Sequence, residues 1–300
     1  MSTRQARRRQ QRTNQRRGRP APRKQTPWYF GPWGLGGAIA AIVVVVVIIA
    51  VEGSGAKAAV LFKPHPVPAP VLHAVTRAPA STVAAVGSGG QADAWTPIAT
   101  PLPPLLTSGG KPEFLYIGAE YCPFCATERW AMINALSRFG TFSGLKLMKS
   151  SSTDVYPSTN TFTTRSARYS SRYVSFASVE ETDNTGKKVL QVPTSEQQSL
   201  YTTYSGGGIP FIDLSNRATA GVGYDPGVLH VTPSDRNSGP LSWQTIAADM
   251  TIPTTPQTKG IIGNANWLTA GICHMTGNQP ASVCKTPTIS GLEAQLQFHR

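Results

Sequence analysis

The feature that most constrains the fold is the position of two cysteines, in the segment Cys122-Pro123-Phe124-Cys125. Residues 113–118, directly before it, form a short apolar run that predicts a strand. In residues 126–136, directly after it, apolar side chains recur with the three-to-four spacing of one buried helix face, at Ala126, Trp130, Ile133 and Leu136. The C-x-x-C pair is therefore expected where a strand turns into a helix.

This position predicts a reactive thiol. At a helix N-terminus, Cys122 would lie close to unpaired backbone N–H groups and to the positive end of the helix dipole, which lowers a thiol pKa. Pro123 suits the first helical position, because its missing N–H has no partner there. We therefore expect Cys122 to be a solvent-exposed thiolate nucleophile. Cys125, one turn further in, would be the buried resolving thiol.

The N-terminal region has the charge pattern of a membrane anchor. The chain has 28 Lys and Arg residues against 15 Asp and Glu residues, a net charge of +13, and ten of the basic residues lie between Arg4 and Lys24. An uncharged apolar run, 35–51, follows and predicts a membrane-spanning helix over 31–52, with the basic flank in the cytoplasm. A cleaved signal peptide is the main alternative, with small residues at 54–56. Nucleic-acid binding is not expected, because no aromatic residues are interleaved with the arginines.

Four segments are expected along the chain. Residues 1–30 form a disordered basic cytoplasmic tail, and 31–52 the membrane helix. Residues 53–108, rich in proline and alanine, predict an extended stalk, although 71–75 and 82–86 are also compatible with short helices that dock on the domain. Residues 109–300 form the extracytoplasmic domain. All four cysteines lie beyond the membrane segment, which fits an oxidising compartment.

The remaining patterns predict an α/β domain, a central sheet flanked by helices with insertions, preceded by one transmembrane helix. After the first strand and helix, strands are expected at 145–148 and 173–179. A helix over 196–204, capped by Ser195, precedes a strand pair at 206–214 and 219–223. Two more helices are expected, at 242–250 and 261–275.

This order resembles the thioredoxin fold. The segment 119–125, Ala-Glu-Tyr-Cys-Pro-Phe-Cys, is similar to the thioredoxin motif, with a glutaredoxin-like core. The resemblance implies that Gly208-Ile209-Pro210 is the family's cis-proline loop, so Ile209 and Pro210 would shape the substrate groove beside the cysteines.

More closely, the chain is similar to the membrane-anchored, thioredoxin-like domain-of-unknown-function family nine-two-nine. The resemblance spans roughly residues 111–285 and is carried by the segments 118–125, 128–130, 136–140, 210–213 and 273–284. One position departs from the thioredoxin pattern. Where thioredoxins place a buried acid, this chain has Tyr116, and Glu120 belongs to a position near the surface in the family.

Both cysteine pairs have alternatives. Cys122 and Cys125 can form a redox dithiol, half of a zinc site or a plain structural disulfide, and the strand–helix context favours the redox dithiol. Cys273 and Cys284 are more consistent with a structural disulfide across a short loop than with a second redox pair that exchanges with Cys122.

We therefore expect a membrane-anchored, single-pass, extracytoplasmic thiol–disulfide oxidoreductase. It would act on cysteines of exported proteins, use no cofactor or metal, and be recycled by a membrane redox partner. The alternative is a non-catalytic, thioredoxin-like binding module that holds a partner at the membrane surface with its cysteines permanently paired.

Overall fold

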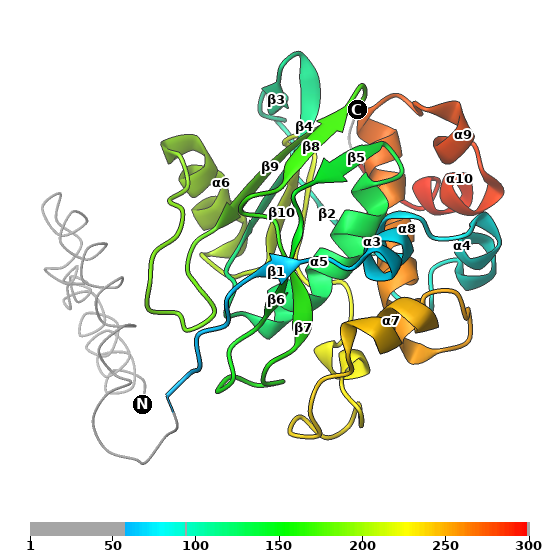
Figure 1. Ribbon diagram of the computed structural model, residues 1–300. Coiled ribbons are helices and arrows are strands. Elements are labelled where there is room, and N and C mark those ends of the chain that lie inside the picture. The colour runs from blue at the N-terminus through cyan, green and yellow to red at the C-terminus, as the bar shows by residue number, and fades with distance from the viewer. Residues whose placement is uncertain (1–57, 94, 299–300) are drawn as a thin grey trace, which may run out of the picture. The chain divides into compact units, whose positions relative to one another are not determined.

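The computed structural model describes residues 58–93 and 95–298, which form a mixed α/β domain and confirm that class (Figure 1). A six-stranded sheet lies at its centre, in the order β2-β11-β10-β4-β3 with β9 also paired to β4. Its strands are β2 (Trp95–Pro97), β3 (Thr107–Ser108), β4 (Lys111–Gly118), β9 (Ser175–Glu180), β10 (Phe211–Leu214) and β11 (Ala218–Ala220).

Strand β4 organises this sheet. It is paired in parallel with β9, from Glu113 opposite Ser175 to Gly118 opposite Glu180. Strand β10 runs antiparallel to β4 on its other side, with Phe211 opposite Ile117. Because β4 and β9 run the same way, their C-terminal ends lie side by side, at the edge where α5 begins.

Helix α5 (Pro123–Leu136) is buried on all sides, which corrects the expectation of a single buried face. Every residue of the helix except Phe124 is buried, including Glu128 and Arg129. The apolar spacing therefore predicts the helix correctly, but it does not predict that the polar residues of the helix are buried as well. The sheet lies on one side of α5, and α8, α3 and β7 contact it elsewhere.

Helix α6 (Ser195–Ser205) lies on the opposite side of the sheet from α5 and α8 (Figure 1). Its N-cap is Thr194 rather than the predicted Ser195. The Thr194 hydroxyl accepts from the Gln197 N–H, and the Gln197 side chain accepts from the Thr194 N–H, a reciprocal capping box.

The C-terminal half supplies the helical cover. The long α8 (Pro256–Met275) contacts α5 along its length, and α10 (Pro287–Glu293) packs against α8. The shorter elements are η2 (Pro226–Leu229), α7 (Trp243–Asp249) and α9 (Ala281–Cys284). The predicted helices at 242–250 and 261–275 correspond to α7 and α8.

The insertion between α5 and β9 forms two small sheets, one of them together with a strand from the N-terminal segment. Strand β5 (Gly140–Ser143) pairs with β8 (Arg168–Ser171), and β6 (Lys146–Lys149) lies between β1 (His65–Pro66) and β7 (Asn160–Thr163). The predicted strands at 145–148 and 173–179 correspond to β6 and β9.

Residues 58–108 are not an extended stalk. They contain α3 (Ala69–Thr76) and α4 (Ala80–Val86), and β1 and β2 pair with strands of the domain. Val71 and Val75 are fully buried, so the docked-helix alternative for 71–75 and 82–86 is the arrangement adopted. Pro68 and Pro79 stand at the N-caps of these helices, so the prolines that suggested a stalk mark helix starts instead.

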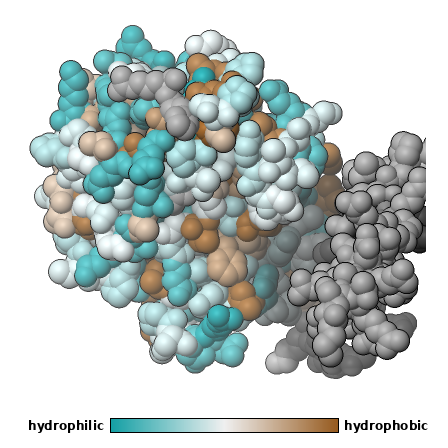
Figure 2. Space-filling view, turned by 180° about the vertical axis from the view of Figure 1, so that it is seen from behind, coloured by the Kyte–Doolittle hydropathy of each residue, from teal (hydrophilic) through white to brown (hydrophobic). Residues whose placement is uncertain are grey.

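The predicted tail and membrane helix, residues 1–52, lie outside the described residues. Within 58–93 and 95–298, no helix combines the length and apolar character needed to cross a bilayer. The face drawn in Figure 2 is mainly hydrophilic or neutral, with hydrophobic residues scattered over it.

Candidate active site

Cys122 and Cys125 lie where β4 passes into α5. A short loop leaves β4 after Gly118, and the Cys122 N–H donates to the Ala119 carbonyl at 3.2 Å. Cys122 is the N-cap of α5, with Pro123 at the first helical position. Its sulfur accepts from the Cys125 N–H at 3.1 Å. The backbone therefore presents a donor to the first sulfur, as the sequence predicted.

The Ile209-Pro210 segment lies beside this sulfur. The peptide bond between the two residues is cis, and the Ile209 carbonyl oxygen is 4.0 Å from the Cys122 sulfur. Pro210 is buried directly before β10, whose pairing with β4 brings the two segments together. All four residues expected to form the reactive pair and the groove are thus adjacent.

The two thiols have opposite pKa shifts. The Cys125 thiol lowers the pKa of Cys122 most, and the backbone N–H groups of Cys125 and Phe124 and the Arg129 charge lower it further, against the opposing effect of burial. Burial raises the pKa of Cys125 well above its usual value. Cys122 is only 4% exposed, which corrects the expectation of an open thiolate. Only a narrow part of its surface can be reached from outside.

A buried ion pair lies beneath the cysteines. The Arg129 Nε and Nη2 atoms donate to the two carboxylate oxygens of Glu180, and Nη2 also donates to the Ala119 carbonyl. Both side chains are fully buried. Sequence reasoning missed this pair. The available signal was Arg129 itself, four residues after Cys125 in a helix and hence on the same face.

Tyr116 and Glu120 differ from what the resemblance implies. Tyr116 is fully buried under the site, and burial raises its pKa well above 10, so its hydroxyl stays protonated near neutral pH. Glu120 is also buried rather than near the surface, at 2% exposure. It accepts from the Thr163 hydroxyl at 2.7 Å and lies 3.9 Å from Arg165.

Two loops border the cysteines. Residues 150–159 are joined to the site by the Ser151 N–H, which donates to the Tyr121 carbonyl at 2.8 Å. In that loop Tyr156 packs edge-on against Phe124, with ring centroids 6.4 Å apart. Residues 182–190 are joined to the loop before Cys122 by the Glu120 N–H, which donates to the Thr182 carbonyl at 2.9 Å. The Phe124 and Tyr156 rings therefore join the loop 150–159 to the start of α5, beside the C-x-x-C pair.

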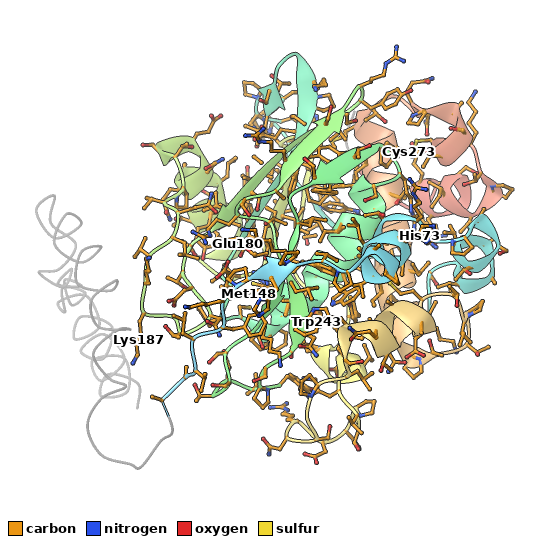
Figure 3. All side chains as sticks on the ribbon, in the orientation of Figure 1. His73, Met148, Glu180, Lys187, Trp243 and Cys273 are labelled. Carbon is orange, nitrogen blue, oxygen red and sulfur yellow. A yellow bond between two sulfur atoms is a disulfide. The ribbon has the colours of Figure 1, made fainter. Side chains whose placement is uncertain are left out.

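Cys273 and Cys284 form a disulfide that joins α8 to α9. Both residues are buried, at 0% and 1% exposure. Figure 3 shows Cys273 well away from Glu180, which belongs to the cluster beneath the C-x-x-C pair. The disulfide is therefore neither exposed nor next to Cys122.

The part of the chain that the structure describes has no group of three or more His, Cys, Asp and Glu residues placed to hold a metal ion. Cys122 and Cys125 have no second pair of ligands beside them there, so the described residues offer no counterpart for half of a zinc site.

Comparison with known proteins gives one match. No curated protein and no solved structure matches the chain. Residues 102–204, which contain β4, the C-x-x-C pair, α5 and β9, match the family described as Domain of unknown function (DUF929), the family that the sequence resembles.

Proposed function

We propose that the protein is a thiol–disulfide oxidoreductase of thioredoxin-like fold that uses Cys122 and Cys125. The observation that carries the proposal is the Cys122 sulfur, which has a lowered pKa, accepts the Cys125 N–H and lies beside the Ile209 carbonyl. A thiolate at a helix N-terminus next to a second thiol is the arrangement that disulfide exchange requires.

The chain order of the elements supports a thioredoxin-like fold. Strand β4, helix α5 and parallel strand β9 form the first half, and α6, antiparallel β10 and β11, and α8 form the second. The C-x-x-C pair stands after the first of these strands, and the cis-proline stands before β10.

The exchange proceeds in two balanced steps. The Cys122 thiolate attacks one sulfur of a substrate disulfide, and the S–S electron pair leaves on the other sulfur, which takes up a proton. Cys125 then attacks the Cys122 sulfur and releases the second substrate sulfur. The two cysteines lose two electrons to the substrate, and the reverse sequence oxidises a substrate dithiol.

Single-cysteine variants test this activity. Cys125→Ser removes the resolving thiol, so mixed disulfides through Cys122 with cysteine-containing exported proteins should accumulate on a non-reducing gel. Cys122→Ser should trap none. Pro210→Thr should prolong a trapped complex, because the groove beside Cys122 is altered. If Cys125→Ser traps nothing and Cys122 is alkylated with the pH dependence of a free cysteine, the oxidoreductase proposal fails.

A binding module is the second candidate. The observations that favour it are the 4% exposure of Cys122 and the presence of Tyr116 in place of an acid. In that case the two cysteines would remain a disulfide, and neither variant would change the amount of partner bound. The gel experiment separates the candidates, because the free Cys122 of Cys125→Ser should capture exported proteins as mixed disulfides only if these proteins normally exchange disulfides at this site.

We also propose that this domain is extracytoplasmic and anchored by residues 31–52, with a membrane redox partner that recycles the dithiol. The basic tail and the apolar run support this topology. Reporter fusions after residue 60 should be active only outside the cytoplasm. An active cytoplasmic reporter, or a mature chain that begins near Ala56, would contradict the anchor.

A further inference from the structure

The buried Arg129 guanidinium has one nitrogen without a hydrogen-bond acceptor among the described residues. Its Nε atom donates to Glu180 Oε1 at 2.8 Å, and Nη2 donates to Glu180 Oε2 and to the Ala119 carbonyl. The Nη1 atom is buried and has no acceptor among the described residues. A charged donor left unpaired in the interior is costly, so such groups are rare unless function requires them.

Arg129 is also the positive charge that acts on both cysteines. It is four residues after Cys125 in α5, on the same side of the helix. Its charge lowers the pKa of Cys122 and opposes the effect of burial on Cys125. Its Cζ atom lies 5.8 Å from the centre of the Tyr116 ring, so it stands directly beneath the site.

Neighbouring groups cannot take the same role. Tyr116, Tyr121 and Tyr201 are near enough to Cys125 for its charge to influence them, but burial raises their pKa values, so they are neutral near pH 7. Both Glu180 oxygens are already acceptors, with Oε1 also bonded to the Thr164 hydroxyl at 3.0 Å. Neither a free base nor a second cation therefore acts on Cys125 among these groups.

We propose that Arg129, fixed by Glu180 and the Ala119 carbonyl, is a positioning residue that stabilises the Cys125 thiolate in the resolving step, where thioredoxins use a buried acid. The inference rests on the proposed oxidoreductase activity. It assigns Glu180 the task of holding the guanidinium and moderating its charge.

The step balances without any added reagent. In the mixed disulfide, the Cys122 sulfur is bonded to the substrate sulfur. The Cys125 thiol loses its proton, and its sulfur attacks Cys122 Sγ. The Cys122–substrate bond breaks, and the substrate sulfur departs with the electron pair and takes up the proton. Arg129 neither gains nor loses a proton; its charge lowers the energy of the thiolate that forms.

Single-turnover release of thionitrobenzoate separates the two thiols. Excess dithionitrobenzoate added to the reduced full-length chain should release one equivalent when Cys122 attacks and a second when Cys125 resolves. We expect Arg129→Met to slow the second release about tenfold or more at neutral pH and to move its pH–rate midpoint upward. Arg129→Lys, which keeps the charge, should restore much of the rate.

Three further variants distinguish an effect of charge from a general loss of folding. Arg129→Met leaves Glu180 unpaired, so Arg129→Met/Glu180→Gln removes both charges and should show a smaller upward shift than Arg129→Met alone. Glu180→Gln alone leaves an unopposed cation and should move the midpoint downward. Arg138→Met is the matched control, because Arg138 binds the neutral Asn134 and Asn266 side chains.

The outcomes distinguish the two proposals. If the wild-type protein never releases a second equivalent, the oxidoreductase proposal itself fails. If it releases two equivalents and the second release has the same pH midpoint in the double variant as in the wild type, only the role of Arg129 is overturned. A shift of equal size in Arg138→Met would also overturn it, since a general loss of packing would then explain the effect.

Discussion

Gly118 leaves the space that Tyr116 and Cys125 occupy at the end of β4. A Cβ atom built on Gly118 would lie 2.1 Å from the Tyr116 hydroxyl oxygen and 3.1 Å from the Cys125 sulfur. Glycine is therefore required at position 118, because the Tyr116 ring and the Cys125 sulfur approach its backbone too closely for a side chain. The tyrosine hydroxyl that it accommodates has no hydrogen-bond partner among the residues that the structure describes. The packing of the Tyr116 ring, rather than a hydrogen bond from its hydroxyl, holds the side chain in this position.

Gly118→Ala should therefore destabilise the domain. The fully buried ring cannot move away easily, so we expect a loss of about 1–3 kcal/mol in the free energy of unfolding, measured by urea titration. Tyr116→Phe alone should change stability little, because the hydroxyl that it removes is unpaired. In the Gly118→Ala background it should recover part of the loss. A wild-type urea midpoint for Gly118→Ala would contradict the close contact.

Helix α5 shows where sequence reasoning succeeds and where it stops. The strand–cysteine–helix order depends on local signals, the apolar run, the proline and the helical spacing, and it was predicted correctly. The polar residues of the helix are buried because their partners come from distant segments. Arg129 meets Glu180, Glu128 meets Asn264, and Asn134 donates to the Val75 carbonyl. No local sequence pattern reveals such pairs. From the sequence alone, a polar residue in a helix is therefore expected to be exposed.

Glu128 makes the contact between α5 and α8 sensitive to pH. Its Oε2 atom accepts from the Gly223 N–H at 3.0 Å and from the Asn264 amide at 2.8 Å. Burial raises its pKa from 4.5 to about 7, against the effect of these two donors. In the unfolded chain the carboxyl ionises near its ordinary pKa, whereas in the folded protein it keeps its proton up to about pH 7. The contribution of Glu128 to the free energy of unfolding is therefore greatest below pH 4.5. It falls as the pH rises to about 7 and is constant above that.

Glu128→Gln should remove this dependence. The amide keeps an oxygen for Gly223 and Asn264 but carries no charge. The free energy of unfolding of the variant should nearly equal that of the wild type at pH 4 and should exceed it increasingly across the window, by about 3 kcal/mol at pH 8. Urea unfolding at several pH values measures this difference. A Gln variant that is less stable than the wild type at pH 8 would show that the ionised carboxylate is the favoured form.

At the scale of the whole molecule, residues 58–108 are part of the domain. The Asn134 amide on α5 donates to the Val75 carbonyl at 3.0 Å, and the Asn266 amide on α8 donates to Val83 and Gly87 carbonyls. Ahead of these helices, the Val60 N–H donates to Ser152 in the loop that borders the site. The segments from residue 58 onward therefore contact the core and an active-site loop, and they belong to the folded domain.

The boundary of the folding unit follows from these contacts. A chain that begins at residue 109 loses α3, α4 and β2, exposes the surface that covers Val75, and leaves the Asn134 and Asn266 amides without their acceptors. It should unfold at a lower urea concentration than a chain that begins at residue 58.

Within the longer chain, Val75→Ala should lower the free energy of unfolding by about 2 kcal/mol, because the side chain is fully buried. Val60→Ala, at a position 69% exposed in the same segment, is the matched control and should stay within about 0.5 kcal/mol of the wild type. Equal midpoints for the two chains would contradict this boundary, because the N-terminal helices would then add nothing to the stability of the domain.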